Sequence, residues 1–239
     1  MRFNDNSNEP LSNSLDVDIR ERFDQAKIAA SYRVGKNERQ TSKNRRELDC
    51  IERAMVGIPE GSTILDLPTG TGRLIPMLSS QNMEVIAADY SEHMLDQAKQ
   101  FWQTQKNPNK VSASTNVSFQ QHDIMHINLA DNAVDVTICN RLFHHYPTPK
   151  LRRQALTELC RVTSQRIILS YFSNFAFSAA RFHLKNKLKN HVATDRVPIW
   201  PSAMHADIAA CGLTLCQTLP VGFGRSPQTY LTLTVPGSR

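Results

Sequence analysis

The sequence has 239 residues, of which 40% are hydrophobic and 21% charged. This composition is ordinary for one globular domain that buries a full core. No run of residues approaches the roughly 20 apolar residues that cross a bilayer, and the N-terminus lacks the basic-then-apolar pattern of a secretory signal. We therefore expect a cytoplasmic protein without a transmembrane segment.

The net charge of +6 raises the question of a polyanionic partner. The excess of basic residues is concentrated between Lys36 and Arg46 and between Arg181 and Arg196. These two basic clusters are either solvated helix faces or a surface that holds nucleic acid.

The cysteines predict reduced thiols, most of them buried. Their number is odd, they form no Cys-x-x-Cys pair, and no histidine lies near them at metal-ligand spacing. We therefore expect neither a metal site nor a disulfide framework. The five residues are Cys50, Cys139, Cys160, Cys211 and Cys216.

The N-terminal region predicts a flexible tail over residues 1–18, rich in Asn, Ser and Asp, and then a short helix from Ile19 to Tyr32. Apolar residues repeat at helical spacing again from Leu48 to Met55. The turn at Ile58 to Gly61 ends that helix before the first strand.

The most informative segment runs from Thr63 to Arg73. An apolar run ends in Asp66, a turn then carries Gly70 and Gly72, and a helix-like run follows, which predicts a strand, a tight loop and a helix start. Asp89 ends the next apolar run, roughly 20 residues downstream, where a nucleotide-binding βαβ unit places its ribose-binding acid. Two acids at two strand ends therefore frame one cleft.

This loop does not fit a dinucleotide. The dinucleotide pattern needs a third glycine at the position of Ile75. Asp66 would also face the pyrophosphate, and a carboxylate beside a diphosphate is electrostatically unfavourable. A cationic ligand suits this acid better.

These residues resemble the first motif of the class I S-adenosylmethionine-dependent methyltransferases, and the similarity continues from Leu48 to Val235. Asp89 to Ala98 resembles the second motif, Gln121 to Ile124 the third, and Val134 to Asn140 the fourth strand. The resemblance implies S-adenosyl-L-methionine as cofactor, with S-adenosyl-L-homocysteine as product. It implies cofactor contacts from Asp66, Pro68, Thr69, Gly70, Gly72, Asp89, Tyr90, Met94, Asp123, Ile124 and Asn140.

Three details of this resemblance matter. Asp89 would accept hydrogen bonds from the ribose hydroxyls, and Asp123 either binds the adenine amino group or caps the following turn. Pro68 stands where the family usually has glycine. Because proline fixes φ near −65°, the loop there must have a conformation that tolerates it.

Helical and strand patterns continue to alternate after Asn140. Leu151 to Val162 is amphipathic, Arg166 to Phe172 predicts a buried strand, and Ser202 to Cys211 a helix. Thr214 to Leu219 and Gln228 to Val235 predict the last two strands. The pattern predicts an α/β fold, a Rossmann-like doubly wound, mostly parallel sheet with a C-terminal antiparallel hairpin and helices on both faces. The resemblance implies seven strands.

We expect one methyltransferase domain over residues 19–239. The resemblance implies that residues 19–57 form a helical lid over the cofactor. It also suggests that the insertion at residues 174–201 covers the substrate pocket. The alternatives for the insertion are a surface helix docked on the domain, or peripheral membrane contact by the basic residues 181–192.

The candidate catalytic residues follow the fourth and fifth strands. His144 and His145 could act as a general base, or their rings could pack near the cofactor. Tyr171 either faces the pocket or packs. Arg141 could pair with an anionic acceptor, or it could bridge to Asp135 or Glu158.

We expect methyl transfer to a small molecule. Asn140-Arg-Leu-Phe differs from the Asn-Pro-Pro-Tyr-type motif of amino-directed enzymes, so an O, S or C acceptor ranks above an exocyclic amine. One alternative is methylation of a polyanion, such as RNA or a phosphorylated glycolipid, at the basic clusters. The other is a non-catalytic partner subunit that only binds the cofactor.

Overall fold

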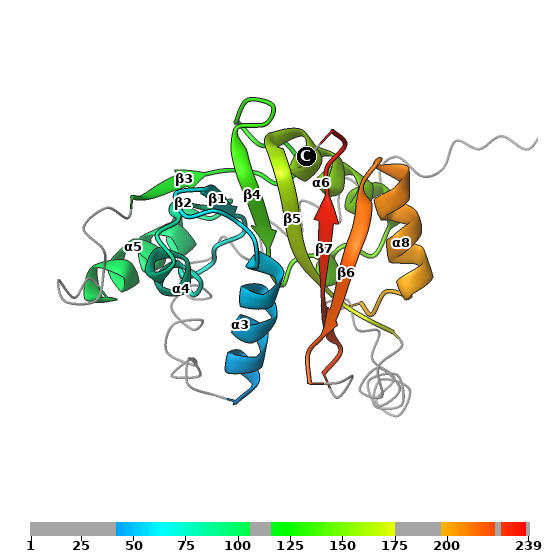
Figure 1. The fold of residues 1–239 in the computed structure, drawn as a ribbon, viewed down its shortest axis with the longest axis horizontal. Helices are drawn as coiled ribbons and strands as arrows, with labels where there is room; N and C mark the ends of the chain where they lie inside the picture. Colours follow the sequence, from blue (N-terminus) through cyan, green and yellow to red (C-terminus); the bar gives the residue numbers. More distant parts are fainter. Residues whose placement is uncertain (1–41, 106–115, 175–196, 223–225, 238–239) are drawn as a thin grey trace, which may run out of the picture.

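Seven strands form one sheet in the order β3-β2-β1-β4-β5-β7-β6 (Figure 1). The computed structural model describes residues 42–105, 116–174, 197–222 and 226–237. The strands are β1 (Thr63–Asp66), β2 (Glu84–Asp89), β3 (Val117–Gln121), β4 (Val134–Cys139), β5 (Thr163–Phe172), β6 (Thr214–Pro220) and β7 (Gln228–Thr234). The first five strands in this order, β3, β2, β1, β4 and β5, pair in parallel. Strand β7 is antiparallel to both β5 and β6. This confirms the predicted parallel sheet with a C-terminal antiparallel hairpin.

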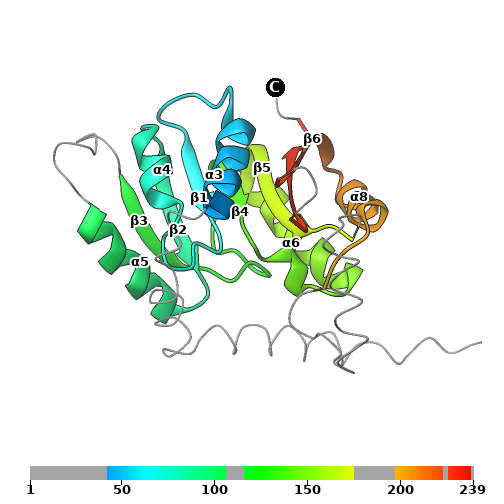
Figure 2. The same ribbon diagram turned by 90° about the horizontal axis from the view of Figure 1, so that it is seen from below.

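Helices cover both faces of this sheet, with α3 and α6 on opposite sides (Figure 2). The helices are α3 (Ser42–Met55), α4 (Ile75–Ser80), α5 (Glu92–Gln105), α6 (Pro149–Val162) and α8 (Pro201–Ala210), with a 3-10 turn, η2 (Phe143–His145). Helix α6 begins where the Thr148 side chain accepts a hydrogen bond from the Leu151 N–H. The first turn tolerates Pro149, which lacks an N–H, because an N–H at that position would have no partner within the helix.

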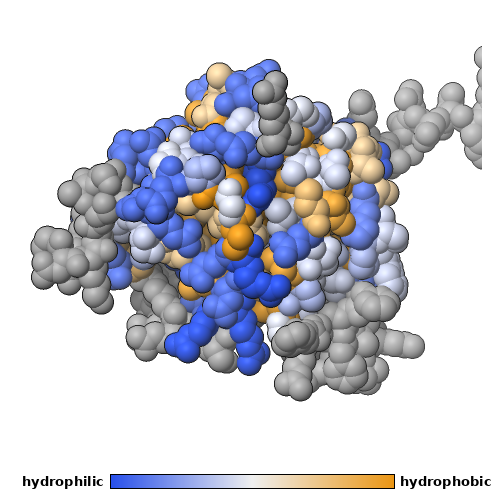
Figure 3. All heavy atoms as spheres, viewed as in Figure 1, coloured by the Kyte–Doolittle hydropathy of each residue, from blue (hydrophilic) through white to orange (hydrophobic). Residues whose placement is uncertain are grey.

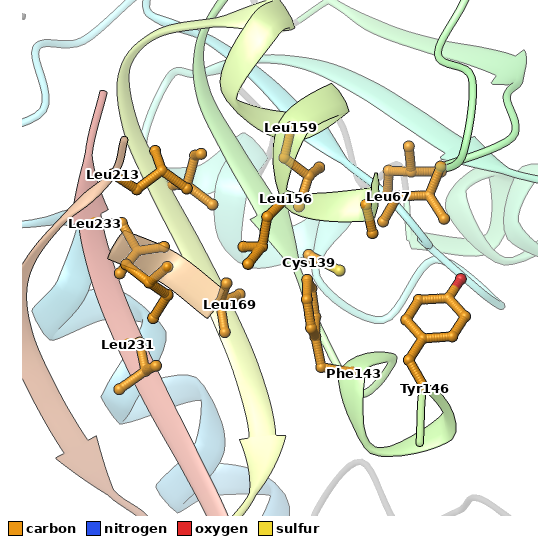
Figure 4. Close-up of a cluster of buried hydrophobic side chains, with 14 of the residues drawn as sticks. Leu67, Cys139, Phe143, Tyr146, Leu156, Leu159, Leu169, Leu213, Leu231 and Leu233 are labelled. Carbon is orange, nitrogen blue, oxygen red and sulfur yellow. The ribbon is translucent and has the colours of Figure 1, made fainter. Parts of the chain in front are cut away.

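The alternation of side chains along each strand divides the core into two clusters. In β1, Ile64 packs under α3 and α4, while Leu65 packs on the other face with α6 and α8. Figure 4 shows part of this larger core cluster, with Leu156 and Leu159 of α6 close to Cys139 and Phe143. A rigid two-sided core therefore fixes the strand ends that carry the site.

Several predicted elements lie outside the described residues. These are the tail at 1–18, the helix at 19–32, the basic cluster from Arg181 to Arg196 and all but the ends of the 174–201 insertion. The two ends of the insertion meet, because the Asn174 N–H donates to the Ile199 carbonyl at 2.9 Å, next to the parallel bridge between Ser173 and Ile199. At the described end of the first basic cluster, Arg45 and Arg46 are exposed on α3, whose outer face is hydrophilic (Figure 3).

All five cysteines are free, and Cys216 alone among them is exposed. Burial raises the pKa of Cys139, which lies at the end of β4. In the described part of the chain, no helix is long and apolar enough to cross a membrane.

Candidate cofactor and acceptor site

Asp66 and Asp89 are the last residues of two neighbouring parallel strands. Strand β1 pairs with β2 in the register that places Asp66 opposite Ala87. The carboxyl ends of parallel strands meet at one edge of a sheet, and in open α/β sheets ligands bind outside that edge. Both carboxylates are buried, with exposed fractions of 1% and 6%. The structure thus brings together the two acids that the sequence predicted.

Asp89 organises the glycine loop. One oxygen of its carboxylate accepts a hydrogen bond from the Gly70 N–H at 2.8 Å, and the other accepts one from the Ser91 N–H at 3.0 Å. The Thr69 N–H donates to the Ala88 carbonyl at 2.7 Å, which holds the loop against β2. Each carboxylate oxygen can accept more than one hydrogen bond, so these two backbone bonds do not by themselves saturate the Asp89 carboxylate.

Asp66 has one engaged oxygen and one open oxygen. Its Oδ2 accepts from the Thr69 hydroxyl at 2.7 Å, whereas Oδ1 is buried with no hydrogen-bond partner among the described residues. Burial raises the pKa of Asp66 to about 7, and Thr69 and Arg73 partly oppose that rise. A buried acid with an open oxygen fits a cationic ligand, because a charge without a partner is costly to bury.

Gly70 and Gly72 both have left-handed backbone angles, with φ of +57° and +78°. Their surroundings differ. A Cβ built on Gly70 meets no atom within 4 Å, whereas one built on Gly72 lies 3.0 Å from Ile75 and 3.1 Å from Ala98. Gly72 therefore allows close packing against α5, and Gly70 borders open space beside Asp89.

Asn140, just beyond β4, belongs to a polar network that extends across the sheet. Its side-chain oxygen accepts hydrogen bonds from Tyr230 at 2.8 Å, Ser170 at 3.2 Å and Gln228 at 3.4 Å. Burial raises the pKa of Tyr230 well above its usual range, so its hydroxyl is a donor at neutral pH. Sequence analysis missed these three partners, which come from β5 and β7.

Arg141 bonds to a carboxylate that the sequence did not indicate. Its Nε and Nη2 donate to Glu47 Oε2 of α3 at 3.0 and 2.6 Å. Arg73, also missed, lies 3.3 Å from the same oxygen and donates to Asn44. Glu47, whose side chain is completely buried, therefore joins α3 to the loops after β1 and β4.

The two partners proposed for Arg141 from the sequence are wrong. Asp135 accepts hydrogen bonds from the Thr63 N–H and the Gln165 side chain. Glu158 pairs with Arg161, which also lowers the pKa of Glu158.

Comparisons with known proteins agree with this geometry. Residues 64–166 match a family model described as a methyltransferase domain. Over this part, somewhat less than half of its length, the chain is similar to a methyltransferase domain. It is 33% identical over 105 residues to an uncharacterized chloroplastic methyltransferase of Arabidopsis thaliana, and 36% identical over 106 residues to an uncharacterized methyltransferase of Schizosaccharomyces pombe. These matches cover 43% and 44% of this chain, but only 28% and 36% of the relatives' own lengths.

A solved structure shares the methyltransferase fold over nearly the whole chain. It is the magnesium protoporphyrin IX methyltransferase of Synechocystis PCC 6803 with bound S-adenosylhomocysteine. The TM-score is 0.73, and the match covers 92% of this chain and 99% of that one. The sequences are 17% identical, so this likeness concerns the fold alone.

The other residues predicted around the methyltransferase cofactor lie at or near the same sheet edge. Pro68 is half-buried and follows a cis peptide bond, and Tyr90 is 39% exposed. Met94 is buried, and its N–H donates to Ser91. Asp123 accepts from the Met125 N–H, which is the turn-capping alternative, and Ile124 packs in the larger core cluster. Contacts of these side chains with the cofactor stay predictions.

The candidate catalytic residues pack closely. His144 stacks on Phe172 with ring centroids 4.0 Å apart and an angle of 7°, and the His145 ring lies 4.2 Å from His144. Both histidines are buried. Tyr171 lies within the larger core cluster, where burial raises its pKa, so the structure places it in a packing position rather than facing a pocket.

The contrast between the two glycines gives a matched prediction. Gly72→Ala should lower the free energy of unfolding by about 2 to 4 kcal/mol, from left-handed strain and overpacking. Gly70→Ala should cost only about 1 kcal/mol in stability yet weaken S-adenosylhomocysteine binding at least about tenfold, because its methyl enters the open space. Urea unfolding and calorimetry on both variants test this. Equal effects of the two substitutions on binding and stability would contradict it.

The raised pKa of Asp66 predicts a pH-dependent affinity. A cationic ligand favours the carboxylate, so S-adenosylhomocysteine binding should weaken as the pH falls below about 7, by up to about tenfold per unit. The ligand-free protein should show the opposite trend. Because the folded pKa lies above the unfolded value, this contribution to stability is present at acidic pH and is lost as the pH rises through about 7.

Calorimetric titrations between about pH 5.5 and 8 measure this dependence. Asp66→Asn is the control, since an amide at this position does not titrate. A wild-type affinity that is flat across this range would show that Asp66 does not respond to the ligand.

Proposed function

We propose that the protein transfers a methyl group from S-adenosylmethionine to a small-molecule acceptor, at an oxygen, sulfur or carbon atom. The observation that carries this proposal is the pair of buried acids at adjacent strand ends around the Gly70 loop. The open Asp66 oxygen fits an ammonium group, the Asp89 carboxylate fits ribose hydroxyls, and the space over Gly70 fits a ligand held against backbone.

The proposed cofactor contacts follow the strand ends. The loop after β1 would hold the methionine end, the residues after β2 the ribose, the residues after β3 the adenine, and the end of β4 would lie beneath the methyl. The residues proposed for the methionine end are Asp66, Pro68, Thr69, Gly70 and Gly72, and those for the ribose are Asp89, Tyr90 and Met94. Asp123 and Ile124 are proposed for the adenine, and Asn140 for the position beneath the methyl group.

The cofactor, when bound, supplies a methyl group already activated by its sulfonium. The protein therefore needs no nucleophile of its own, and its residues contribute positioning and the exclusion of water. His144 or His145 could accept a proton from the acceptor. Their stacking also fits the alternative that they shape the pocket wall.

An exocyclic amine is the less favoured acceptor. Recognition of an amine requires a hydrogen-bond acceptor near the methyl group, and the Asn140 side-chain oxygen already receives three hydrogen bonds within the protein. An amide oxygen has two lone pairs, so little capacity is left for a substrate N–H. This occupancy supports an O, S or C acceptor.

The lids over the site are also proposals. Helix α3, at the end of the proposed 19–57 lid, reaches the loop after β4 through the Glu47–Arg141 pair. The end of the 174–201 insertion returns to the histidine loop, where the Val197 N–H donates to the His144 carbonyl at 2.8 Å. Both contacts support the proposal that the two lids lie next to the acceptor side of the site.

Methyl-labelled cofactor in a cell lysate, followed by mass spectrometry, tests the proposed function. Small metabolites should gain one labelled methyl with the wild-type protein and none with Asp89→Ala. Label in RNA or glycolipid would favour the polyanion alternative, whose affinity should fall steeply with salt through counterion release. Cofactor binding without any labelled product would favour the non-catalytic subunit.

A further inference from the structure

A second charged group adjoins the acids of the cofactor loop. It consists of Arg73, Arg141 and Glu47, which we call the arginine cluster. Two guanidinium groups share the Glu47 carboxylate, and Arg73 also acts on Asp66, where it partly opposes the rise in pKa that burial causes. Tyr230 and Asn140, its polar neighbours, are neutral.

The hydrogen bonds of the arginine cluster are incomplete. Glu47 Oε2 takes both bonds from Arg141 and the contact with Arg73, whereas Glu47 Oε1 is buried with no partner in the described part of the chain. The Arg73 Nη2 is likewise buried and has no hydrogen-bond partner there. A guanidinium has five N–H donors, and Arg141 uses Nε and one Nη2 hydrogen on Glu47. The cluster thus holds unused donors.

Arg141 also carries backbone strain. Its φ is +60°, a left-handed conformation that a residue with a Cβ rarely adopts. The Arg141 N–H donates to the Ser170 hydroxyl of β5 at 2.8 Å, which helps to hold this conformation. Strained residues of this kind concentrate at functional sites, where the surrounding structure compels them.

The strand order places Arg141, the most exposed residue of the arginine cluster, on the acceptor side. The cofactor loop and its two acids follow β1 and β2, while Asn140 and Arg141 follow β4, the neighbour of β1 on the other side. A cofactor bound over the ends of β1 and β2 leaves the ends of β4 and β5 for the methyl acceptor. Arg141 keeps 29% of its side chain exposed there, against 14% for Arg73.

We propose that Arg141, with Arg73 behind it, binds an anionic group of the acceptor, either a carboxylate or a phosphate. This rests on the proposed function and narrows its substrate class to small anionic molecules. The planar guanidinium matches both anions with two parallel hydrogen bonds. Glu47 holds the Arg141 guanidinium in place through Nε and one Nη2 hydrogen, which leaves the other Nη donors for the acceptor.

Anion binding to protein saturated with S-adenosylhomocysteine tests this assignment. Ligand-observed NMR would measure benzoate against benzamide, its neutral isostere, and phosphorus NMR would measure inorganic phosphate. The variants are Arg141→Gln, Arg141→Lys and the control Arg153→Gln, which removes an exposed arginine paired with Asp207. Circular dichroism checks that each variant is folded, and Arg141→Lys keeps the charge should Arg141→Gln fail to fold.

We expect benzoate or phosphate to bind, and benzamide to bind at least about tenfold more weakly, which corresponds to one charge-assisted contact. Arg141→Gln should lose at least about tenfold in anion affinity, and Arg141→Lys less, because lysine keeps the charge but not the fork. Arg153→Gln should match wild type. The affinity for S-adenosylhomocysteine should stay within about twofold in all variants.

Three results would overturn the anion site. The first is the absence of anion binding, and the second is anion binding unaffected by Arg141→Gln. The third is a parallel loss of S-adenosylhomocysteine affinity, which would assign Arg141 to the cofactor's own carboxylate. Failure of the proposed function is distinct, since wild-type protein would then bind no S-adenosylhomocysteine at all, whether or not anions bind.

Discussion

Asp89→Ala should lower the affinity for S-adenosylhomocysteine by about 100-fold or more, since hydrogen bonds to a charged group contribute roughly 1.5–3 kcal/mol each. The substitution removes the acceptors proposed for both ribose hydroxyls. It also releases the Gly70 and Ser91 N–H groups that the carboxylate now holds, so the loop loses its fixed position. Isothermal titration calorimetry on folded protein measures the effect directly.

Two variants calibrate the Asp89→Ala result. Asp89→Asn keeps one acceptor oxygen and should fall between wild type and Asp89→Ala. Asp131→Ala removes an exposed carboxylate that pairs with Arg161, and it should bind like wild type. Asp89→Ala protein that bound within about threefold of wild type would mean that the ribose does not lie on this acid.

Glu47→Ala should lower the free energy of unfolding by about 3 kcal/mol, because removing one partner of a buried ion pair leaves its charges uncompensated. Glu47 is fully buried, and Arg73 and Arg141 both depend on its Oε2. Helix α3 would lose its polar attachment to the loops after β1 and β4. Urea unfolding, with the slope compared between variants, measures the change.

An exposed pair gives the control for Glu47→Ala. Asp96→Ala breaks the contact with Lys99 on the surface of α5, where both side chains are about half-exposed or more, and it should leave stability almost unchanged. Comparable losses in the two variants would show that burial of Glu47 adds nothing to the ion pairs.

Local sequence patterns predicted the half of the site that follows β1 and β2. The acids and glycines there lie within one βαβ unit, whose geometry is repeated among nucleotide-binding folds. Gly70, for example, follows Asp66 by four residues and meets Asp89 through an adjacent parallel strand. Such contacts are set by the fold class itself, and the sequence identified that class correctly.

The acceptor half depends on pairings that no local pattern carries. Glu47 and Arg141 are 94 residues apart, and Tyr230 and Asn140 are 90 apart. Tyr230 reaches Asn140 because β7 inserts between β5 and β6, and the register that aligns it with Ser170 comes from sheet packing. Asp135 was a poor choice for Arg141 because it lies near the start of β4 and Arg141 lies beyond its end. The four strand steps from Asp135 to Cys139 alone span roughly 13 Å at 3.3 Å per residue.

The structure of the protein with S-adenosylhomocysteine bound tests the central claim most directly. We predict that the ribose hydroxyls lie on the Asp89 carboxylate and that the amino group lies beside Asp66, with backbone contact at Gly70. A ligand bound at another surface, or no ligand density at saturating concentration, would contradict the assignment of this sheet edge as the cofactor site.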